Sequence, residues 1–93
     1  MENYLVRIED VIWRRIGDEV VVIAEDGLSF HKLNQTAADI WELCDGSYKP
    51  EQIAEILCEK YDIALEEASA DVHETIGKMV GLGIMKERER INQ

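Results

Sequence analysis

The chain has 93 residues, a length that suits one domain with one modest core. Hydrophobic residues make up 46% of it, which is typical of a globular protein, and no apolar run approaches the roughly 20 residues that a membrane span needs. Twenty acidic and ten basic side chains give a formal net charge of −10, which repels polyanions such as nucleic acids on average and favours solubility or a cationic partner.

The N-terminal residues and the cysteines indicate a compartment. The opening stretch MENYLVRIED carries acids where a secretory signal would need bases and an apolar segment, so we expect a cytoplasmic protein that does not associate with membranes. Cys44 and Cys58 do not form a CxxC pair, and each falls on an apolar helical stripe. We therefore expect two reduced core thiols and no disulfide.

The first third of the chain predicts three strands after a lead-in over residues 1–10. Each segment is rich in β-branched residues or alternates with a period of two, and turn signals separate the segments at Gly17-Asp18 and at Glu25-Asp26-Gly27. The predicted strands are Val11–Ile16, Glu19–Ala24 and Leu28–Leu33. Short turns favour an antiparallel meander, in which the apolar middle strand is central and covered on both faces and the outer two are edges.

Three helical stripes follow the strands. Asn34 is a good cap for the first helix, which Asp45-Gly46 ends, and Pro50 suits the first turn of the second helix. The third helix ends near Gly81 and Gly83. The stripes are Ala37, Ile40, Trp41 and Cys44; Ile53, Ile56, Leu57 and Tyr61; and Leu65, Ala68, Val72, Ile76, Met79, Val80 and Gly83.

Strands followed by helices predict an α+β fold. We expect a winged-helix-like domain over residues 11–85, with a three-stranded antiparallel sheet followed by three helices. Ile84-Met85 could add a brief strand, and residues 86–93 alternate charges without an apolar stripe, which predicts a loose tail.

The residue types that carry catalysis do not gather in any recognisable pattern. His31 and His73 could meet, with Asp71 or Glu74, if the sheet packs on the third helix, but HExxH and Cys/His ligand spacings are absent. The glycines near residue 81 end a helix, whereas a phosphate loop opens one. We expect a protein that is not an enzyme and that has no catalytic residue, metal or cofactor.

Two features predict a binding surface. The edge strand Leu28–Leu33 offers spare N–H and C=O groups to another extended chain, unless His31 and Lys32 protect that edge. The third helix carries a strip of small residues formed by His73, Gly77 and Gly81, which either packs inside the domain or lets another backbone approach. A groove between the two could accept an added strand. Ser29 and Phe30 direct their backbone groups to opposite sides of the strand, and the sequence does not say which side is open.

The segment LNQTAADIWELCDGSYKPEQIAEIL resembles the central block of the PqqD family, the pyrroloquinoline-quinone biosynthesis protein D group. The matching pairs are Leu33-Asn34, Ile40-Trp41 and Asp45-Gly46, and GLGIM resembles the end of the family's third helix. The likeness covers roughly residues 11–85. The second turn, Ala24-Glu25-Asp26-Gly27, lacks the Pro-Glu pair that is usual in quinone makers, so the resemblance supports the broad family better than the quinone pathway.

The resemblance implies a RiPP recognition element, a module that binds the leader of a ribosomally made precursor peptide. Such a module presents the peptide to a modifying enzyme, often a radical SAM enzyme or a leader peptidase. In the family, the leader adds as a strand beside the third strand and lies against the third helix. The implied peptide-binding residues are Leu28, Ser29, Phe30, His31, Lys32, Leu33, Val72, Thr75, Ile76 and Met79.

Two other functions remain open from the sequence. A winged-helix transcription regulator has the right order of elements, but the second helix places Lys60 among Glu51, Glu55 and Glu59, whereas a recognition helix should be basic. A structural module could instead pair with a second copy through its edge strand, and such a homodimer could also accompany peptide binding.

Overall fold

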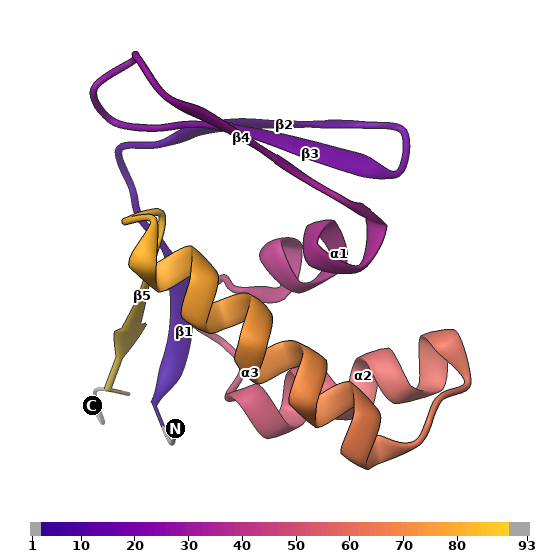
Figure 1. Ribbon diagram of the computed structural model, residues 1–93. Coiled ribbons are helices and arrows are strands. Elements are labelled where there is room, and N and C mark those ends of the chain that lie inside the picture. Colours follow the sequence, from indigo (N-terminus) through magenta and orange to yellow (C-terminus); the bar gives the residue numbers. More distant parts are fainter. Residues whose placement is uncertain (1–2, 90–93) are drawn as a thin grey trace.

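The computed structural model describes residues 3–89. The elements are β1 (Tyr4–Arg7), β2 (Ile12–Ile16), β3 (Glu19–Ile23), β4 (Phe30–Leu33), α1 (Gln35–Leu43), α2 (Pro50–Tyr61), α3 (Leu65–Gly81) and β5 (Met85–Arg88). Strands β2, β3 and β4 form one antiparallel sheet in that order, and β1 pairs with β5 in a second sheet (Figure 1). The predicted α+β, winged-helix-like order of three strands and then three helices is confirmed.

The three-stranded sheet has one covered face and one open face. The helices lie on one side of it in Figure 1. Two cross-strand rows of side chains point toward the helices. They are Trp13, Val22 and His31, and Arg15, Val20 and Leu33. Ile12, Ile23 and Phe30 form a row on the other face, where all three are exposed. The prediction that β3 is central is correct. The prediction that it is covered on both sides is wrong, because no helix lies over that second face within residues 3–89.

Helix α1 lies beneath the sheet and supplies much of the core. The Oδ1 atom of Asn34 accepts a hydrogen bond from the N–H of Ala37 at 3.0 Å, so the predicted cap is confirmed. Trp41 is completely buried, and its ring meets that of Trp13 edge to face with the centroids 6.1 Å apart. The helix itself ends at Leu43. Gly46 follows with a φ of 92° and donates its N–H to the carbonyl oxygen of Leu5.

Helices α2 and α3 pack against each other and close the core from below. Pro50 begins α2 as predicted, and Ile53 and Leu57 are buried. The buried stripe of α3 consists of Ala68, Val72, Ile76 and Met79. Both cysteines are free thiols; Cys44 is buried and Cys58 half-buried. Burial raises the pKa of the Cys44 thiol to about 12, so this thiol is protonated and unreactive at neutral pH.

The terminal strands β1 and β5 form a pair that the sequence analysis did not predict. Leu5 of β1 and Met85 of β5 are buried in the core. The Nη1 atom of Arg7 donates hydrogen bonds to the carbonyl oxygens of Trp41 and Glu42, at 2.8 and 3.0 Å, and so holds β1 against the end of α1. Residues 4–7 of the lead-in are therefore part of the domain, and the loose-tail prediction is wrong for residues 86–88. Residues 90–93 of that tail lie outside the described part of the chain.

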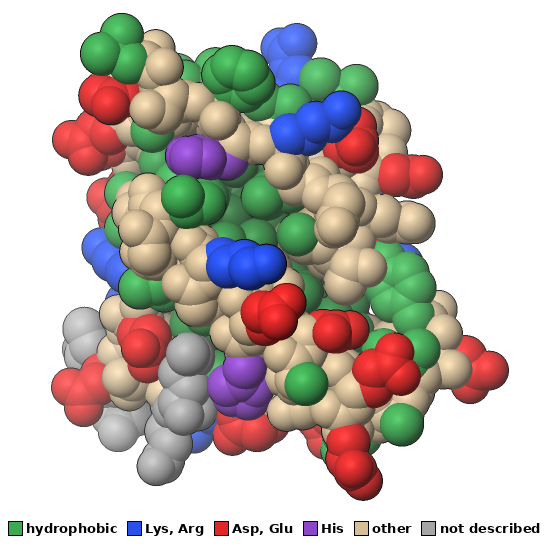
Figure 2. All heavy atoms as spheres, in the orientation of Figure 1, with side chains coloured by type: hydrophobic (Ala, Val, Ile, Leu, Met, Phe, Trp, Pro, Cys, Tyr) green, Lys and Arg blue, Asp and Glu red, His purple; other side chains and the backbone are tan. Residues whose placement is uncertain are grey.

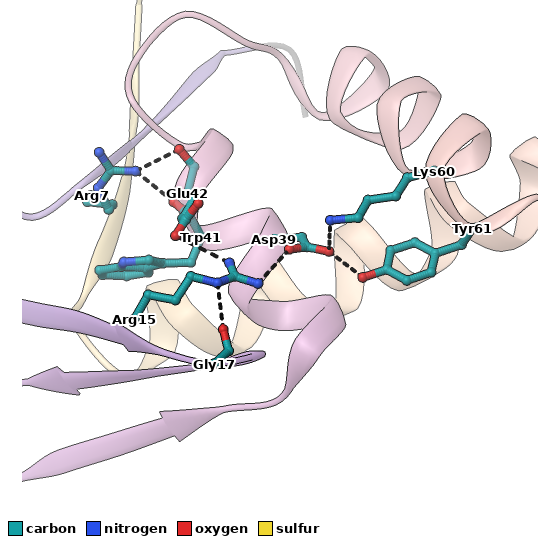
Figure 3. Close-up of polar contacts among 8 residues, drawn as sticks. All are labelled: Arg7, Arg15, Gly17, Asp39, Trp41, Glu42, Lys60 and Tyr61. Atoms are coloured by element: carbon teal, nitrogen blue, oxygen red, sulfur yellow. Dashed lines mark hydrogen bonds and ion pairs between the residues drawn. The ribbon is translucent and has the colours of Figure 1, made fainter.

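A buried carboxylate links β2, α1 and α2 (Figure 3). Asp39 of α1 is within 3.3 Å of Arg15 Nη2 and 2.9 Å of Lys60 Nζ, and it accepts a hydrogen bond from the Tyr61 hydroxyl. Burial by itself would raise the pKa of Asp39, but the hydrogen bonds from Tyr61 and Lys60 outweigh it, and the pKa is lowered. Burial and the bond to Asp39 raise the pKa of Tyr61 to about 12.

Candidate functional site

Strand β4 is an edge of the three-stranded sheet, and the register shows which of its residues face the open side. The N–H of Ala24 donates to the carbonyl oxygen of Ser29 at 2.8 Å, which makes this a hydrogen-bonded pair. The pairing continues without a bulge from Ile23 opposite Phe30 onward. Because such pairs alternate along an antiparallel ladder, His31 bonds to β3, whereas Phe30 and Lys32 direct their N–H and C=O groups to the open edge.

A groove runs between this open edge and α3. Its volume is about 660 Å³, and it is lined by Phe30–Leu33 of β4, by Asn34, Thr36 and Ala37 at the start of α1, and by Asp71, Glu74, Thr75, Lys78, Met79 and Leu82 from α3 and its C-terminal end. Leu33 and Met79 are almost fully buried, whereas Phe30 and Leu82 are 71% and 49% exposed. Figure 2 shows a hollow in this face with hydrophobic side chains inside it and charged side chains around it.

The groove contains six of the ten residues that the resemblance implies: Phe30, His31, Lys32, Leu33, Thr75 and Met79. Leu28 and Ser29 precede β4 in the turn, and neither lines the groove. Val72 and Ile76 are completely buried and face the core. A direct contact between a peptide and these two side chains therefore does not fit the geometry.

Four groove residues of α3 and its end were missed in the sequence: Asp71, Glu74, Lys78 and Leu82. They recur at helical spacing beside the buried stripe of α3. The apolar periodicity identifies the buried stripe, but it does not show that the residues next to it line a groove. The strip formed by His73, Gly77 and Gly81 does not line the groove. Its Gly77 and Gly81 are exposed, and a Cβ atom added at either would meet open space.

The two histidines do not form a metal site. His31 lines the groove, and Nδ1 of His73 lies 2.8 Å from the carbonyl oxygen of Ser69, one turn earlier on α3. Within residues 3–89, no group of three or more His, Cys, Asp or Glu side chains is arranged to hold a metal ion. None of the helices in this part of the chain is long and apolar enough to cross a membrane.

The charged side chains around the groove are weakly paired. Lys78 and Glu74 lie 3.8 Å apart one turn from each other on α3, and both are largely exposed. Lys32 lies on the outer face of the sheet, where its Nζ is 3.3 Å from Glu19. Asp71 forms no ion pair with any described residue, and it is exposed. A ligand in the groove would therefore meet accessible charges on the α3 side.

The arrangement of sheet, helices and terminal strands matches that of solved leader-binding proteins. The structure of TbiB1 in complex with the TbiA(beta) leader peptide superposes with a TM-score of 0.80 at 19% identity, over 91% of this chain and 99% of that one. A lasso peptide synthetase B1 complexed with the leader peptide gives 0.78 at 17% identity, over 88% and 96%. The chain thus has the fold of a RiPP recognition element.

The family comparison agrees with this fold. The PqqD truncation of Methylobacterium extorquens PqqCD, a stand-alone RiPP recognition element, has a TM-score of 0.74 at 21% identity, over 89% of this chain and 88% of that one. The profile of the family described as coenzyme PQQ synthesis protein D (PqqD) matches residues 19–85. The chain belongs to the PqqD family, whose members are non-catalytic peptide-binding domains. A comparison with curated proteins found no match.

Proposed function

We propose that this protein binds the leader of a ribosomally made precursor peptide by strand addition at β4, and presents it to a modifying enzyme in the cytoplasm. The observation that carries the proposal is the open edge of β4, where Phe30 and Lys32 offer backbone groups beside a groove of about 660 Å³. The fold likeness to proteins solved with leader peptides supports it.

An added strand would use both the open edge of β4 and the apolar residues of the groove behind it. A new strand would lie about 4.8 Å from β4, and its side chains would alternate between the two faces of the sheet. Phe30 and Lys32 supply two donors and two acceptors to it. The side chains on the inner face would meet Leu33, Ala37 and Met79, which are buried or half-buried apolar residues of the groove. Backbone pairing thus supplies affinity, and the apolar contacts supply selectivity.

The proposal also includes a partner enzyme that modifies or cleaves the bound peptide. A radical SAM enzyme or a leader peptidase would act on the peptide while β4 holds its leader, because a bound leader raises the effective concentration of the attached core segment. Self-pairing of two copies through β4 would use the same edge. A homodimer of that kind would compete with the leader for it.

Two proline variants of β4 test strand addition. Proline removes one N–H, so Lys32→Pro removes a donor that points to the open edge, and His31→Pro removes one that bonds to β3. The probe is a peptide of about ten residues, long enough to span β4, selected from a random library on the unaltered protein. We expect Lys32→Pro to keep most of the melting temperature and lose most of the peptide affinity. His31→Pro should lower the melting temperature markedly.

The matched control is Lys32→Ala, which removes the same side chain and keeps the N–H. It should bind the peptide nearly as well as the unaltered protein. Normal peptide binding by Lys32→Pro would overturn strand addition at β4. Amide chemical-shift changes confined to α2, with β4 silent, would place the peptide elsewhere.

Duplex DNA is not favoured as the ligand. In a winged-helix regulator α2 would be the recognition helix, and its exposed side chains include Glu51, Glu55 and Glu59. Phosphate groups would be repelled by this surface.

A further inference from the structure

We propose that the groove selects a basic leader: an extended segment that places Lys or Arg against Asp71 and Glu74, and an apolar side chain about four positions away against Leu82. The inference rests on the proposed function, because it concerns the peptide bound at β4. It adds the chemical class of that peptide and the spacing of its two recognition positions.

The α3 side of the groove changes character along its length. Its earlier part carries Asp71 and Glu74, and its far end carries Leu82, which is half-exposed beside the groove. Between them, Lys78 lies 3.8 Å from Glu74 in a largely exposed pair that holds neither charge firmly. Asp71 has no cationic partner within residues 3–89. A peptide cation near Asp71 and Glu74 therefore gains an attraction that the protein does not already satisfy.

The β4 side of the groove does not cancel this preference. Lys32 points to the outer face of the sheet, where its Nζ lies 3.3 Å from Glu19, so it is not directed at a peptide side chain in the groove. His31 is half-buried on the inner face. Phe30 is 71% exposed and lies on the same outer face as Lys32, so its ring is not directed at α3. In Figure 1 α3 runs opposite to β4, which brings its C-terminal end toward the start of β4.

The spacing follows from helix and strand geometry. Glu74 and Leu82 are separated by about 12 Å along α3 at 1.5 Å per residue. An extended chain advances about 3.3 Å per residue and covers that length in about four residues. Because side chains of a strand alternate, positions four apart share one face, and both would point into the groove. An odd spacing would turn one of the two outward.

The net charge of −10 attracts any basic peptide, so the test must separate the groove from the whole molecule. Glu66 gives the matched control, since it is an exposed acid on the same helix that does not line the groove. Asp71→Asn, Glu74→Gln and Glu66→Gln each remove one negative charge. All three sites are exposed, and the native fold should persist in each variant.

The experiment selects peptides of about ten residues from a random display library, a length that spans the groove in extended form. Individual peptides are then measured by fluorescence anisotropy at physiological salt. We expect enrichment of Lys or Arg four positions from an apolar residue. Asp71→Asn and Glu74→Gln should each raise the Kd about two- to five-fold, and Glu66→Gln should leave it unchanged. Replacing the peptide cation by Glu should raise the Kd about ten-fold.

Two outcomes overturn the inference in different ways. In the first outcome, the selected peptides bind at β4 and Lys32→Pro abolishes their binding, but they show no preference for basic residues or their Kd changes equally in all three acid variants. The proposed function then stands, and selection of a basic leader is wrong. If the unaltered protein enriches no peptide, or enriches peptides that Lys32→Pro binds normally, both the proposed function and this inference fail.

Discussion

Asp39 carries a buried negative charge where β2, α1 and α2 meet. Its carboxylate contacts Arg15 and Lys60 and accepts a hydrogen bond from the Tyr61 hydroxyl (Figure 3). A buried ion in such a setting stabilises the fold only while all partners stay charged or hydrogen-bonded. The lowered pKa of Asp39 expresses the same preference, because the folded protein favours the ionised form.

The lowered pKa predicts how the stability depends on pH. The ordinary pKa of an aspartate side chain is 3.8, and the pKa of Asp39 in the folded chain lies below that. The contribution of Asp39 is therefore fully present above pH 4 or so and is lost as the pH falls through the folded-state pKa. Asp39→Asn should be less stable than the unaltered protein at pH 7, and the difference in unfolding free energy should shrink toward pH 3 in urea titrations.

Glu42→Gln is the control for this prediction. Glu42 also pairs with Arg15, at 3.2 Å, but its side chain is 41% exposed. Its replacement should change the unfolding free energy little at either pH. A difference between Asp39→Asn and the unaltered protein that stays constant from pH 7 to pH 3 would contradict the assignment of a lowered pKa to Asp39.

At the scale of elements, β1 belongs to the core although it precedes the matched region of the family. The family match begins at residue 19, whereas Leu5 is completely buried. β5 pairs with one edge of β1, and the segment after α1 pairs with the other. On that other edge the N–H of Arg7 donates to the carbonyl oxygen of Cys44, and the N–H of Leu5 donates to the carbonyl oxygen of Tyr48. The strand is thus paired on both sides.

We therefore expect Leu5→Ala to destabilise the domain strongly. Truncation of a fully buried leucine removes apolar contact and leaves a cavity, which costs about 2–5 kcal/mol of unfolding free energy. Urea unfolding followed by tryptophan fluorescence would measure it. The control is Leu28→Ala, since Leu28 is 88% exposed and its truncation should cost little. Equal stability of the two variants would show that β1 does not pack as described.

For the molecule as a whole, the charge distribution decides which classes of partner are possible. The acidic side chains are spread over α2, α3 and the turns, and the net charge is −10. A strong negative field speeds the approach of cationic partners and opposes polyanions. The groove between β4 and α3 adds local selectivity to this long-range effect, through the exposed acids on its α3 side.

We expect no measurable affinity for duplex DNA at physiological salt. Counterion release drives DNA binding only where basic side chains contact phosphates, and the exposed part of α2 carries mostly glutamates. Gel-shift or anisotropy titrations with mixed-sequence duplexes would measure this. Tight binding that weakens steeply with added salt would contradict it and would favour a DNA-binding regulator.

The local sequence determined the three strands of the main sheet, the three helices and their order. Turn signals such as Asp26-Gly27 separated the strands, and Asn34 and Pro50 marked the starts of two helices, because turns and caps depend on residues close together in the chain. The motif around Ile40-Trp41 also placed the chain in its family. From these signals came the expectation of a groove at the third predicted strand.

Only the tertiary structure decided which residues line that groove. An apolar stripe shows that one side of α3 is buried, but not what packs beside it; thus Val72 and Ile76 turned out to face the core, and Asp71 and Leu82 the groove. Likewise, the pairing of β1 with β5 joins residues from opposite ends of the chain, which no local pattern specifies. The open side of Phe30 and Lys32 depends on the register with β3, and that register exists only once the strands have paired.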